Sequence, residues 1–295
     1  MPTEVDHWLP MPVITGVARS GTTLLRLMLD AHPEVAIPAE THFFETLVPR
    51  LDRGERPGRD ELFHTLTDWV TWPDLDVPAD EYRAALDALE VYSVGAGLRT
   101  FYQLYARRRG KRRGGDKSPM NGRYLVRIQE LLPEARFIHI IRDGRDVMVS
   151  LRPMWYSPGH EPSTIARYWR DEILRTRAAA AHLRDYLEIR YEDLLTDARG
   201  LLAGLCDFLD MPMAATMLAY HERARERLAE VQTRYDAAGR VLATQEDRLH
   251  SHRLTSTPPD ASRIGRWRSE LTSEEVGEFG REAGALLEEL GYDAV

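Results

Sequence analysis

The segment Gly16–Thr23 (GVARSGTT) has residue types and a spacing that suit the binding of a phosphate group. An apolar run over 11–17 leads into the segment and predicts a buried strand, and the apolar pattern over 24–29 predicts a helix after it. A glycine-containing turn between a strand and a helix directs backbone N–H groups and the helix N-terminus toward an anion. The segment is therefore predicted to hold a phosphate.

This predicted phosphate loop lacks the lysine that nucleoside-triphosphate enzymes use. Their loop is G-x-x-x-x-G-K-[ST], in which the lysine reaches the β- and γ-phosphates. Here Thr22 occupies the lysine position, and Arg19 provides a cation three residues earlier. A P-loop kinase would also need a magnesium site, and no clear apolar run ending in aspartate provides one. The displaced cation favours a different phosphate-ester chemistry.

A second phosphate-binding pattern follows the apolar run Phe137–Ile141. Arg142 ends this predicted strand, and Ser150 follows eight residues later in a predicted helix. A guanidinium at a strand end and a helical hydroxyl can both reach one phosphate. The alternative for Arg142 is a structural ion pair with an aspartate.

The chain contains only two lysines, Lys111 and Lys117, among 39 basic residues. A lysine in such a sequence indicates a place where a compact ammonium is needed and a planar guanidinium would not substitute. Lys111 lies in the basic run 107–113, which is either a solvated loop or a rim that attracts anions into a cleft. Lys117 is the stronger candidate for chemistry, and its alternative is a solvated loop residue.

Alternating strands and helices must position these residues. The pattern predicts an α/β fold, a parallel sheet with helices on both faces, whose ligands bind at the carboxyl ends of the strands. Strands are expected at 13–17, 35–37, 136–141 and 187–191, and helices at 22–31, 123–132, 145–151, 165–183 and 201–209. One domain over 1–295 is expected, with helical insertions at about 50–115 and 213–250 that either cover the acceptor side or simply pack. Thr272–Glu275 has capping-box spacing, and Gly291 suits the end of that final helix.

Composition excludes several classes of function. A net charge of −8 disfavours nucleic-acid binding, and no apolar run is long enough for a membrane span. The single cysteine, Cys206, excludes an intrachain disulfide and, with a polar N-terminus that lacks a signal-peptide pattern, predicts a cytoplasmic protein. No group of His, Cys and Asp residues has metal-ligand spacing, so no metal is expected. Oligomeric state stays open.

The loop and its flank, which reaches His32-Pro33, resemble the sulfotransferases that use 3′-phosphoadenosine 5′-phosphosulfate (PAPS), especially the tyrosylprotein, heparan and bacterial branches. Ala18 departs from the usual proline of that loop. The strand followed by Arg142 and Ser150 resembles the family's 3′-phosphate motif, and Tyr191-Glu192-Asp193-Leu194 resembles its Y-E-D-L segment. The resemblance implies that the 5′-phosphosulfate contacts Arg19, Ser20, Gly21, Thr22 and Thr23, and that the 3′-phosphate contacts Arg142 and Ser150.

The same resemblance implies contacts to the rest of the nucleotide. It places Tyr191 beside the adenine, although a core aromatic remains the alternative. The segment 263–268 (RIGRWR) resembles a late loop that folds over the nucleotide, with Arg263 and Arg266 as the favoured ligands.

Catalytic roles also follow from the resemblance. Asp116-Lys117-Ser118-Pro119 resembles the family's D-K-[ST]-P segment, so Lys117 and Arg19 are expected to stabilise the leaving phosphate. Glu40 matches the glutamate base, and His42 is the alternative base.

The expected activity is transfer of sulfate from PAPS, leaving PAP, to a hydroxyl or less often an amine. A small molecule, a glycan or a lipid is the expected acceptor, and no metal is required. The remaining alternative is a non-catalytic nucleotide-binding homologue.

Overall fold

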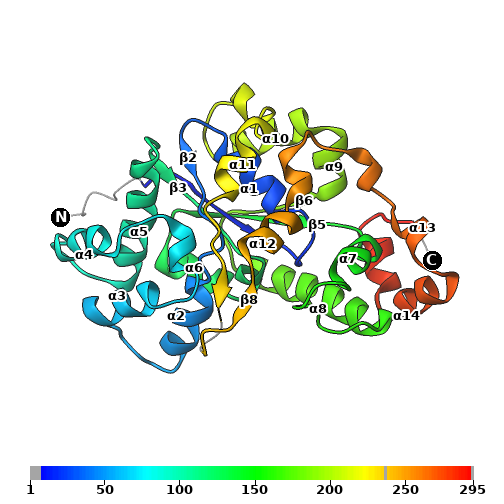
Figure 1. Ribbon diagram of the computed structural model, residues 1–295, viewed down its shortest axis with the longest axis horizontal. Helices are drawn as coiled ribbons and strands as arrows, with labels where there is room; N and C mark the ends of the chain where they lie inside the picture. Colours follow the sequence, from blue (N-terminus) through cyan, green and yellow to red (C-terminus); the bar gives the residue numbers. More distant parts are fainter. Residues whose placement is uncertain (1–7, 236–237, 294–295) are drawn as a thin grey trace.

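A four-stranded parallel sheet forms the centre of the molecule in the computed structural model, which describes residues 8–235 and 238–293 (Figure 1). Its strand order is β4-β1-β5-β6, with β4 at Asp116–Lys117, β1 at Met11–Thr15, β5 at Ala135–Ile141 and β6 at Tyr186–Arg190. Thr15 lies opposite His139, and Ile141 lies opposite Arg190. The carboxyl ends of β1, β5 and β6 therefore meet at one edge, which confirms the predicted α/β class.

Side chains that alternate along β1 explain why both faces of the sheet are covered. Val13 packs in a core cluster with residues of α5 (Val94–Arg108) and α6 (Leu125–Leu131), whereas Ile14 packs with α1 (Thr22–Asp30) and α10 (Ala198–Phe208). Successive strand residues point to opposite faces, so a fully apolar strand needs a helix layer on each side. Figure 1 shows α1 and α10 on one side of the sheet and α6 and α8 (Pro162–Ala180) on the other.

A third core cluster contains Val17 and Ile141, at the carboxyl ends of β1 and β5. There α8 packs against α7 (Gly144–Leu151) and α14 (Ser273–Glu289), with Trp169 and Phe279 fully buried between them. Thr272 and Glu275 form the predicted capping box at the start of α14. The short helix α9 (Tyr191–Thr196) follows β6 directly.

Two strands differ from the sequence-based expectation. The predicted strand at 35–37 forms β2 (Val35–Ala36), but it pairs with β3 (Arg113–Gly114) outside the main sheet. Lys117 was expected on a loop, yet it lies in β4, where it pairs with Ile14 of β1. A two-residue strand contains too few residues to show an alternating pattern, so β4 could not be predicted from periodicity.

The two segments without a family motif differ in structure. Residues 50–115 are largely helical and contain the last three residues of α2 (Phe43–Asp52), then α3 (Arg59–Thr67), η1 (Trp72–Leu75), α4 (Ala79–Asp87) and α5. Residues 213–250 were expected to form a helical insertion, and they are helical only in part. Besides η3 (Ala215–Met217), α11 (His221–Leu228) and α12 (Gln245–Ser251), this segment forms an antiparallel hairpin of β7 (Arg234–Tyr235) and β8 (Val241–Ala243). After it come η4 (Arg253–Ser256), η5 (Ala261–Arg263), α13 (Trp267–Glu270) and α14.

A buried ion pair ties the second of these segments to the phosphate-loop helix. Arg227 of α11 donates to both carboxylate oxygens of Asp30, at 2.6 and 3.0 Å, and the Ile37 amide donates to Asp30 Oδ1 at 2.8 Å. Burial raises the pKa of Asp30, but the charges of Arg227, Lys111 and Arg26 outweigh it and leave this pKa below its usual value.

We expect Asp30→Asn to lower the free energy of unfolding by about 3–5 kcal/mol at neutral pH, because the buried Arg227 would lose one of its two carboxylate partners and keep only Glu230. Since the folded-state pKa of Asp30 is lowered, its contribution is present above the unfolded pKa of about 3.9 and is lost as pH falls through the folded pKa. Urea denaturation at several pH values measures this, with the exposed Asp52→Asn as control. Equal stability of Asp30→Asn and wild type at pH 7 would contradict the prediction.

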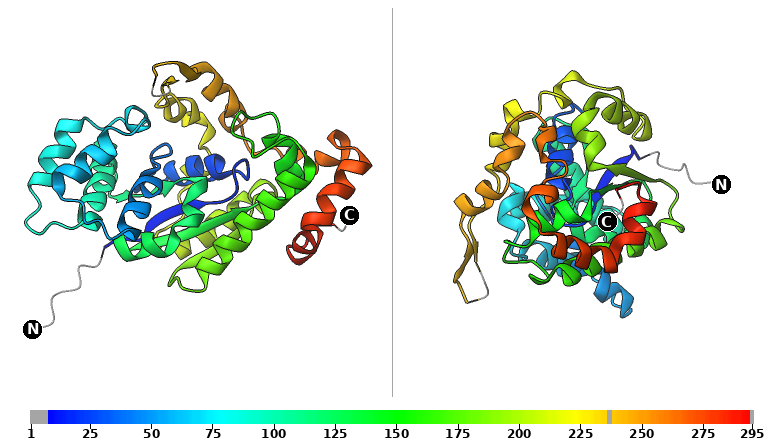
Figure 2. Two further views of the ribbon diagram at one scale, coloured as in Figure 1. Left: turned by 90° about the horizontal axis from the view of Figure 1, so that it is seen from below. Right: turned by 90° about the vertical axis from the view of Figure 1, so that its right-hand side faces the viewer.

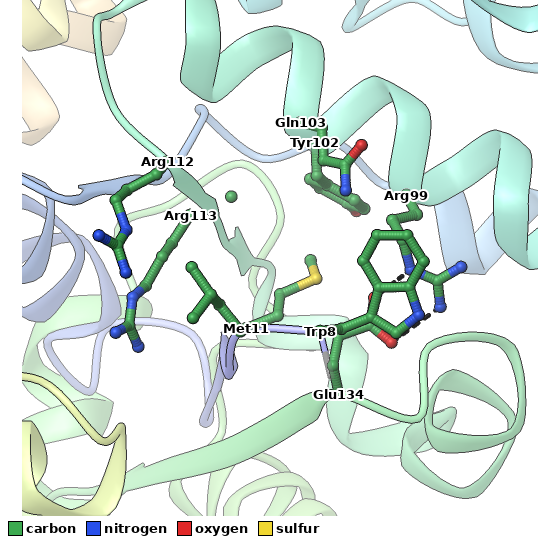
Figure 3. Close-up of a pocket in the computed structure, with 10 residues that line it drawn as sticks. Trp8, Met11, Arg99, Tyr102, Gln103, Arg112, Arg113 and Glu134 are labelled. Atoms are coloured by element: carbon green, nitrogen blue, oxygen red, sulfur yellow. Dashed lines mark hydrogen bonds and ion pairs between the residues drawn. The ribbon is translucent and has the colours of Figure 1, made fainter. Parts of the chain in front are cut away.

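A cavity of about 220 Å³ lies at the opposite edge of the sheet, at the start of β1 (Figure 3). Met11, Trp8 and Tyr102 line it, and Arg99 and Glu134 form an ion pair beside it at 2.5 Å. None of the predicted site residues lines this cavity, so it is separate from the phosphate-loop edge. Among the described residues, no helix combines the length and apolar character needed to cross a bilayer.

Candidate active site

Two glycines allow the phosphate loop to lie directly against β5 and the start of α9. Gly16 has φ +156°, and a Cβ there would lie 2.4 Å from the Ile140 carbonyl oxygen. Gly21 has φ +98°, and a Cβ there would lie 2.4 Å from the ring of Tyr191. Any other residue would push the loop away from its neighbours, so the loop needs glycine at both positions.

The loop presents hydrogen-bond donors that suit an anion. Ser20 Oγ is buried and has no hydrogen-bond partner among the described residues. Thr22 and Thr23 begin α1, whose first-turn N–H groups lack partners within the helix. A phosphate or sulfate group would satisfy these donors and lie at the positive end of the helix.

The second predicted phosphate pattern lies beside the first. Arg19 Nε donates to Ser150 Oγ at 3.1 Å, and the Arg142 guanidinium donates to the Arg19 carbonyl at 3.2 Å. Arg142 also lies over the ring of Tyr191, 4.5 Å from its centre, and its Nε is buried without a partner among the described residues. The structure thus brings Arg19, Arg142, Ser150 and Tyr191 together from three parts of the chain.

The late loop joins this cluster through its backbone. Arg142 donates to the Arg263 carbonyl at 3.0 Å, and the amides of Gly265 and Trp267 donate to Asp146 at 2.8 and 3.0 Å. Burial, together with the charges of Arg266 and Arg142, lowers the pKa of Arg263. Arg266 instead forms a two-pronged ion pair with Glu270, at 2.7 and 2.8 Å. The backbone of Arg263 therefore contacts the cluster directly, whereas the guanidinium of Arg266 is paired with Glu270.

The predicted base and the predicted lysine are in direct contact. Lys117 Nζ lies 2.6 Å from Glu40 Oε1 and 3.5 Å from the Thr23 hydroxyl. Lys117 is only 4% exposed, whereas Glu40 is 33% exposed and can meet a bound molecule. Burial raises the pKa of Glu40, but the charges of Lys117 and His42 outweigh it and hold this pKa well below its usual range. Burial lowers the pKa of Lys117, and Glu40 opposes that shift.

His42 lies between two carboxylates. Its Nδ1 is 2.6 Å from Glu45 Oε1, and its Nε2 is 3.3 Å from Glu40 Oε2. Burial disfavours the charged ring, but the carboxylates of Glu40 and Glu45 prevail and raise the pKa of His42 to about 9. With this pKa both ring nitrogens carry protons at neutral pH, and Nε2 faces Glu40 as an ion-pair partner without forming a hydrogen bond to it.

One buried carboxylate aligns the segments that hold Glu40 and Lys117. Asp116 accepts hydrogen bonds from Thr41 at 2.7 Å, from Tyr102 at 3.0 Å and from Asn121 at 2.7 Å. Burial raises the pKa of Asp116. Thr41 follows Glu40 in the chain and Asp116 precedes Lys117, so these bonds fix the separation of the two charges.

Two residues near this centre were missed by the sequence analysis. Tyr156 interacts with Arg19; burial, the largest effect, raises its pKa. Burial, with the charges of Lys117 and Arg19, lowers the pKa of His252 to about 3, so its ring is neutral. Neither residue belongs to a local motif, and only the packing of the chain brings them here. A neutral imidazole can accept a proton, which distinguishes His252 from His42.

A family model for the sulfotransferase family matches residues 10–215, which include the phosphate loop, Glu40, Lys117, Arg142 and Tyr191. The chain belongs to the sulfotransferase family. It is therefore a transferase enzyme. The late loop with Arg263 and Arg266 lies beyond the matched residues.

Curated relatives support the same family. This sulfotransferase is 30% identical over 305 residues to nodulation protein NoeE of Sinorhizobium fredii, covering 96% of this chain and 67% of that protein. It is 27% identical over 222 residues to protein-tyrosine sulfotransferase A of Caenorhabditis elegans, covering 72% of this chain and 53% of that protein.

Solved structures share the fold of this sulfotransferase. The sulfotransferase domain of the Synechococcus PCC 7002 olefin synthase has a TM-score of 0.60 and 21% identity, covering 99% of both chains. Mouse sulfotransferase SULT7A1, solved in complex with PAP, has a TM-score of 0.51 and 12% identity, covering 94% of this chain and 84% of that one. At these identities the likeness concerns the fold.

Proposed function

We propose that this sulfotransferase transfers the sulfuryl group of PAPS to a hydroxyl group of a small-molecule, glycan or lipid acceptor. The observation that carries the proposal is the bond between Arg19 and Ser150, which joins two phosphate-binding clusters into one surface. A nucleotide with phosphates at both its 5′ and 3′ positions fits two such clusters, whereas ATP has no 3′-phosphate. The unpartnered Ser20 Oγ and Arg142 Nε provide donors, one in each cluster.

Each charged residue then has a role that the chemistry requires. Glu40 accepts the acceptor's hydroxyl proton while the acceptor oxygen forms its bond to sulfur. The bond from sulfur to the phosphate oxygen breaks, and negative charge grows on the phosphate. Arg19 and Lys117 face that charge, and preformed cations in a partly desolvated site stabilise it strongly.

The ion pair between Lys117 and Glu40 links these two roles. While Lys117 bonds to Glu40, it holds the pKa of the carboxylate low, so Glu40 is ionised but weakly basic. As charge grows on the leaving phosphate, Lys117 turns toward it and its hold on Glu40 weakens. Glu40 therefore becomes more basic at the moment when the acceptor proton must leave.

We expect Arg142→Gln to weaken PAP binding by roughly 10- to 150-fold, the loss of a charge-assisted hydrogen bond to phosphate. Isothermal titration calorimetry with PAP measures this loss. Adenosine 5′-phosphate, which lacks the 3′-phosphate, should bind wild type and Arg142→Gln almost equally. Arg136→Gln, at the other end of the same strand, serves as the matched control.

Two results would contradict the proposed donor. Failure of the wild-type enzyme to bind PAP would exclude PAPS as the donor. Magnesium-dependent turnover of ATP would favour a kinase. Normal PAP binding without transfer to any hydroxyl compound would favour a non-catalytic nucleotide-binding protein.

A further inference from the structure

The guanidinium of Arg234, in β7, has no hydrogen bond or ion pair among the described residues, and its Nε is buried. The base of the hairpin is nevertheless well anchored. The backbone N–H of Gln232 donates to Asp74 Oδ1 at 2.7 Å. Arg248 of α12 donates to both oxygens of Asp74 at 3.0 and 2.7 Å. The hairpin itself extends away from the body of the molecule, as the right-hand view of Figure 2 shows. Arg234 therefore lies near the anchored base of the β7–β8 hairpin, which projects from the rest of the molecule.

The carboxylates that act electrostatically on Arg234 are Asp74, Glu40 and Glu45. Glu40 and Glu45 belong to the candidate active site. The segment that anchors the hairpin lies beside them, because Thr71, three residues before Asp74, donates to the Thr41 carbonyl at 2.9 Å.

Each of these three acids already has another partner. Asp74 is bound by Arg248, Glu40 by Lys117, and Glu45 by His42. None of the three forms an ion pair or hydrogen bond with Arg234. Burial and the nearby charge of Arg248 lower the pKa of Arg234, and the three acids oppose that shift only in part.

The basic run 107–113 provides a contrast. Arg108 pairs with Glu81, Arg109 with Glu230, and Lys111 bonds to the Val35 carbonyl. Arg113 donates to the carbonyls of Leu209 and Asp210. These four cations are bound by the protein itself, unlike Arg234.

We propose that Arg234 binds an oxyanion, a carboxylate or a phosphate group, on the acceptor, and that this enzyme sulfates hydroxyl compounds that carry such a charge. The proposal rests on the proposed function, which places the acceptor hydroxyl beside Glu40. The donor engages Arg19, Lys117 and Arg142, and Arg234 is not among the residues assigned to it, so we assign Arg234 to the acceptor. A guanidinium can form two parallel hydrogen bonds to an oxyanion, which compensates its charge and orients the molecule.

Calorimetric titration of PAP-loaded enzyme tests the proposal. The charged probes are 4-hydroxyphenylacetate, 3-hydroxyoctanoate and glycerol 1-phosphate, and the neutral probes are the two methyl esters and glycerol. Wild type is expected to bind at least one charged probe about tenfold or more tightly than its neutral counterpart. The comparison of carboxylates with the phosphate identifies which oxyanion is preferred.

Arg234→Gln is expected to lose this preference and to keep wild-type affinity for PAP. Arg234→Lys should retain part of it, because the charge remains while the planar fork is lost. Arg223→Gln is the matched control, since Arg223 is an exposed arginine of α11 and its replacement makes the same change in net charge.

Three outcomes would overturn the proposal: no charged probe binds wild type at about 10 mM, the preference persists in Arg234→Gln, or Arg223→Gln loses it equally. Unchanged PAP binding by Arg234→Gln shows that the variant is folded. A wild type that fails to bind PAP contradicts the proposed function instead, and the charge preference is then measured on the enzyme without nucleotide.

Discussion

Glu40→Gln is expected to lower kcat by about 10²- to 10⁴-fold, the usual contribution of a general base, while the dissociation constant of PAP stays nearly unchanged. The amide keeps the shape of the carboxylate but cannot accept the acceptor's proton. The measurement is PAP release from PAPS, with an acceptor that wild type sulfates, beside calorimetry with PAP.

Two histidine variants decide whether the base has been assigned correctly. His42→Asn removes the protonated ring between Glu40 and Glu45 and should reduce kcat much less than Glu40→Gln does, because that ring has no free nitrogen to accept a proton. His252→Asn removes the neutral ring near Lys117. If Glu40→Gln keeps its turnover and His252→Asn loses it, then His252 is the base.

Lys117→Met is expected to lower kcat by about 10²- to 10³-fold, comparable with the loss of a donor that stabilises developing charge in a buried site. Methionine has a similar length and packs in the same space, so the change removes mainly the charge. The Glu40 carboxylate is a third exposed and keeps His42 nearby, which limits the damage to the fold.

The other lysine provides the matched control. Lys111 bonds to the Val35 carbonyl and lies 3.8 Å from Asp30, away from Glu40. Lys111→Met should therefore lower the free energy of unfolding and leave kcat close to wild type. An equal loss of kcat in Lys117→Met and Lys111→Met would contradict the assignment of Lys117 as catalytic and Lys111 as structural.

The main elements could be predicted because their signals are local. β1 and residues 137–141 of β5 are largely apolar runs, and in β6 Leu187 and Ile189 flank a glutamate. The helices α1, α7 and α8 follow helical spacing, so the order of these elements indicated the parallel sheet. The strand β4 and the β7–β8 hairpin have only two or three residues each, which is too short for a period. Tertiary pairing alone makes them strands.

The candidate site also contains residues that local motifs reveal and residues that only tertiary packing brings there. The phosphate loop and the spacing from Arg142 to Ser150 are contiguous motifs, so they were found in the sequence. Glu40 and Lys117 were each identified, but their 2.6 Å contact depends on β4 lying beside β1. Tyr156, His252 and Arg234 come from segments without a motif, and their positions depend on how those segments fold over the sheet.

The hydrogen bonds to Asp116 limit how this enzyme can be re-engineered for other acceptors. Tyr102, which provides one of its three donors, lies in the helical segment 50–115, to which no motif of the resemblance maps. A chimera that takes this segment from a relative would also replace the phenol that helps to hold β4. Unless the new segment returns a hydroxyl to the same place, a change intended for acceptor choice would also shift the lysine relative to the glutamate. Acceptor recognition and sulfate transfer are therefore not independently exchangeable modules in this fold.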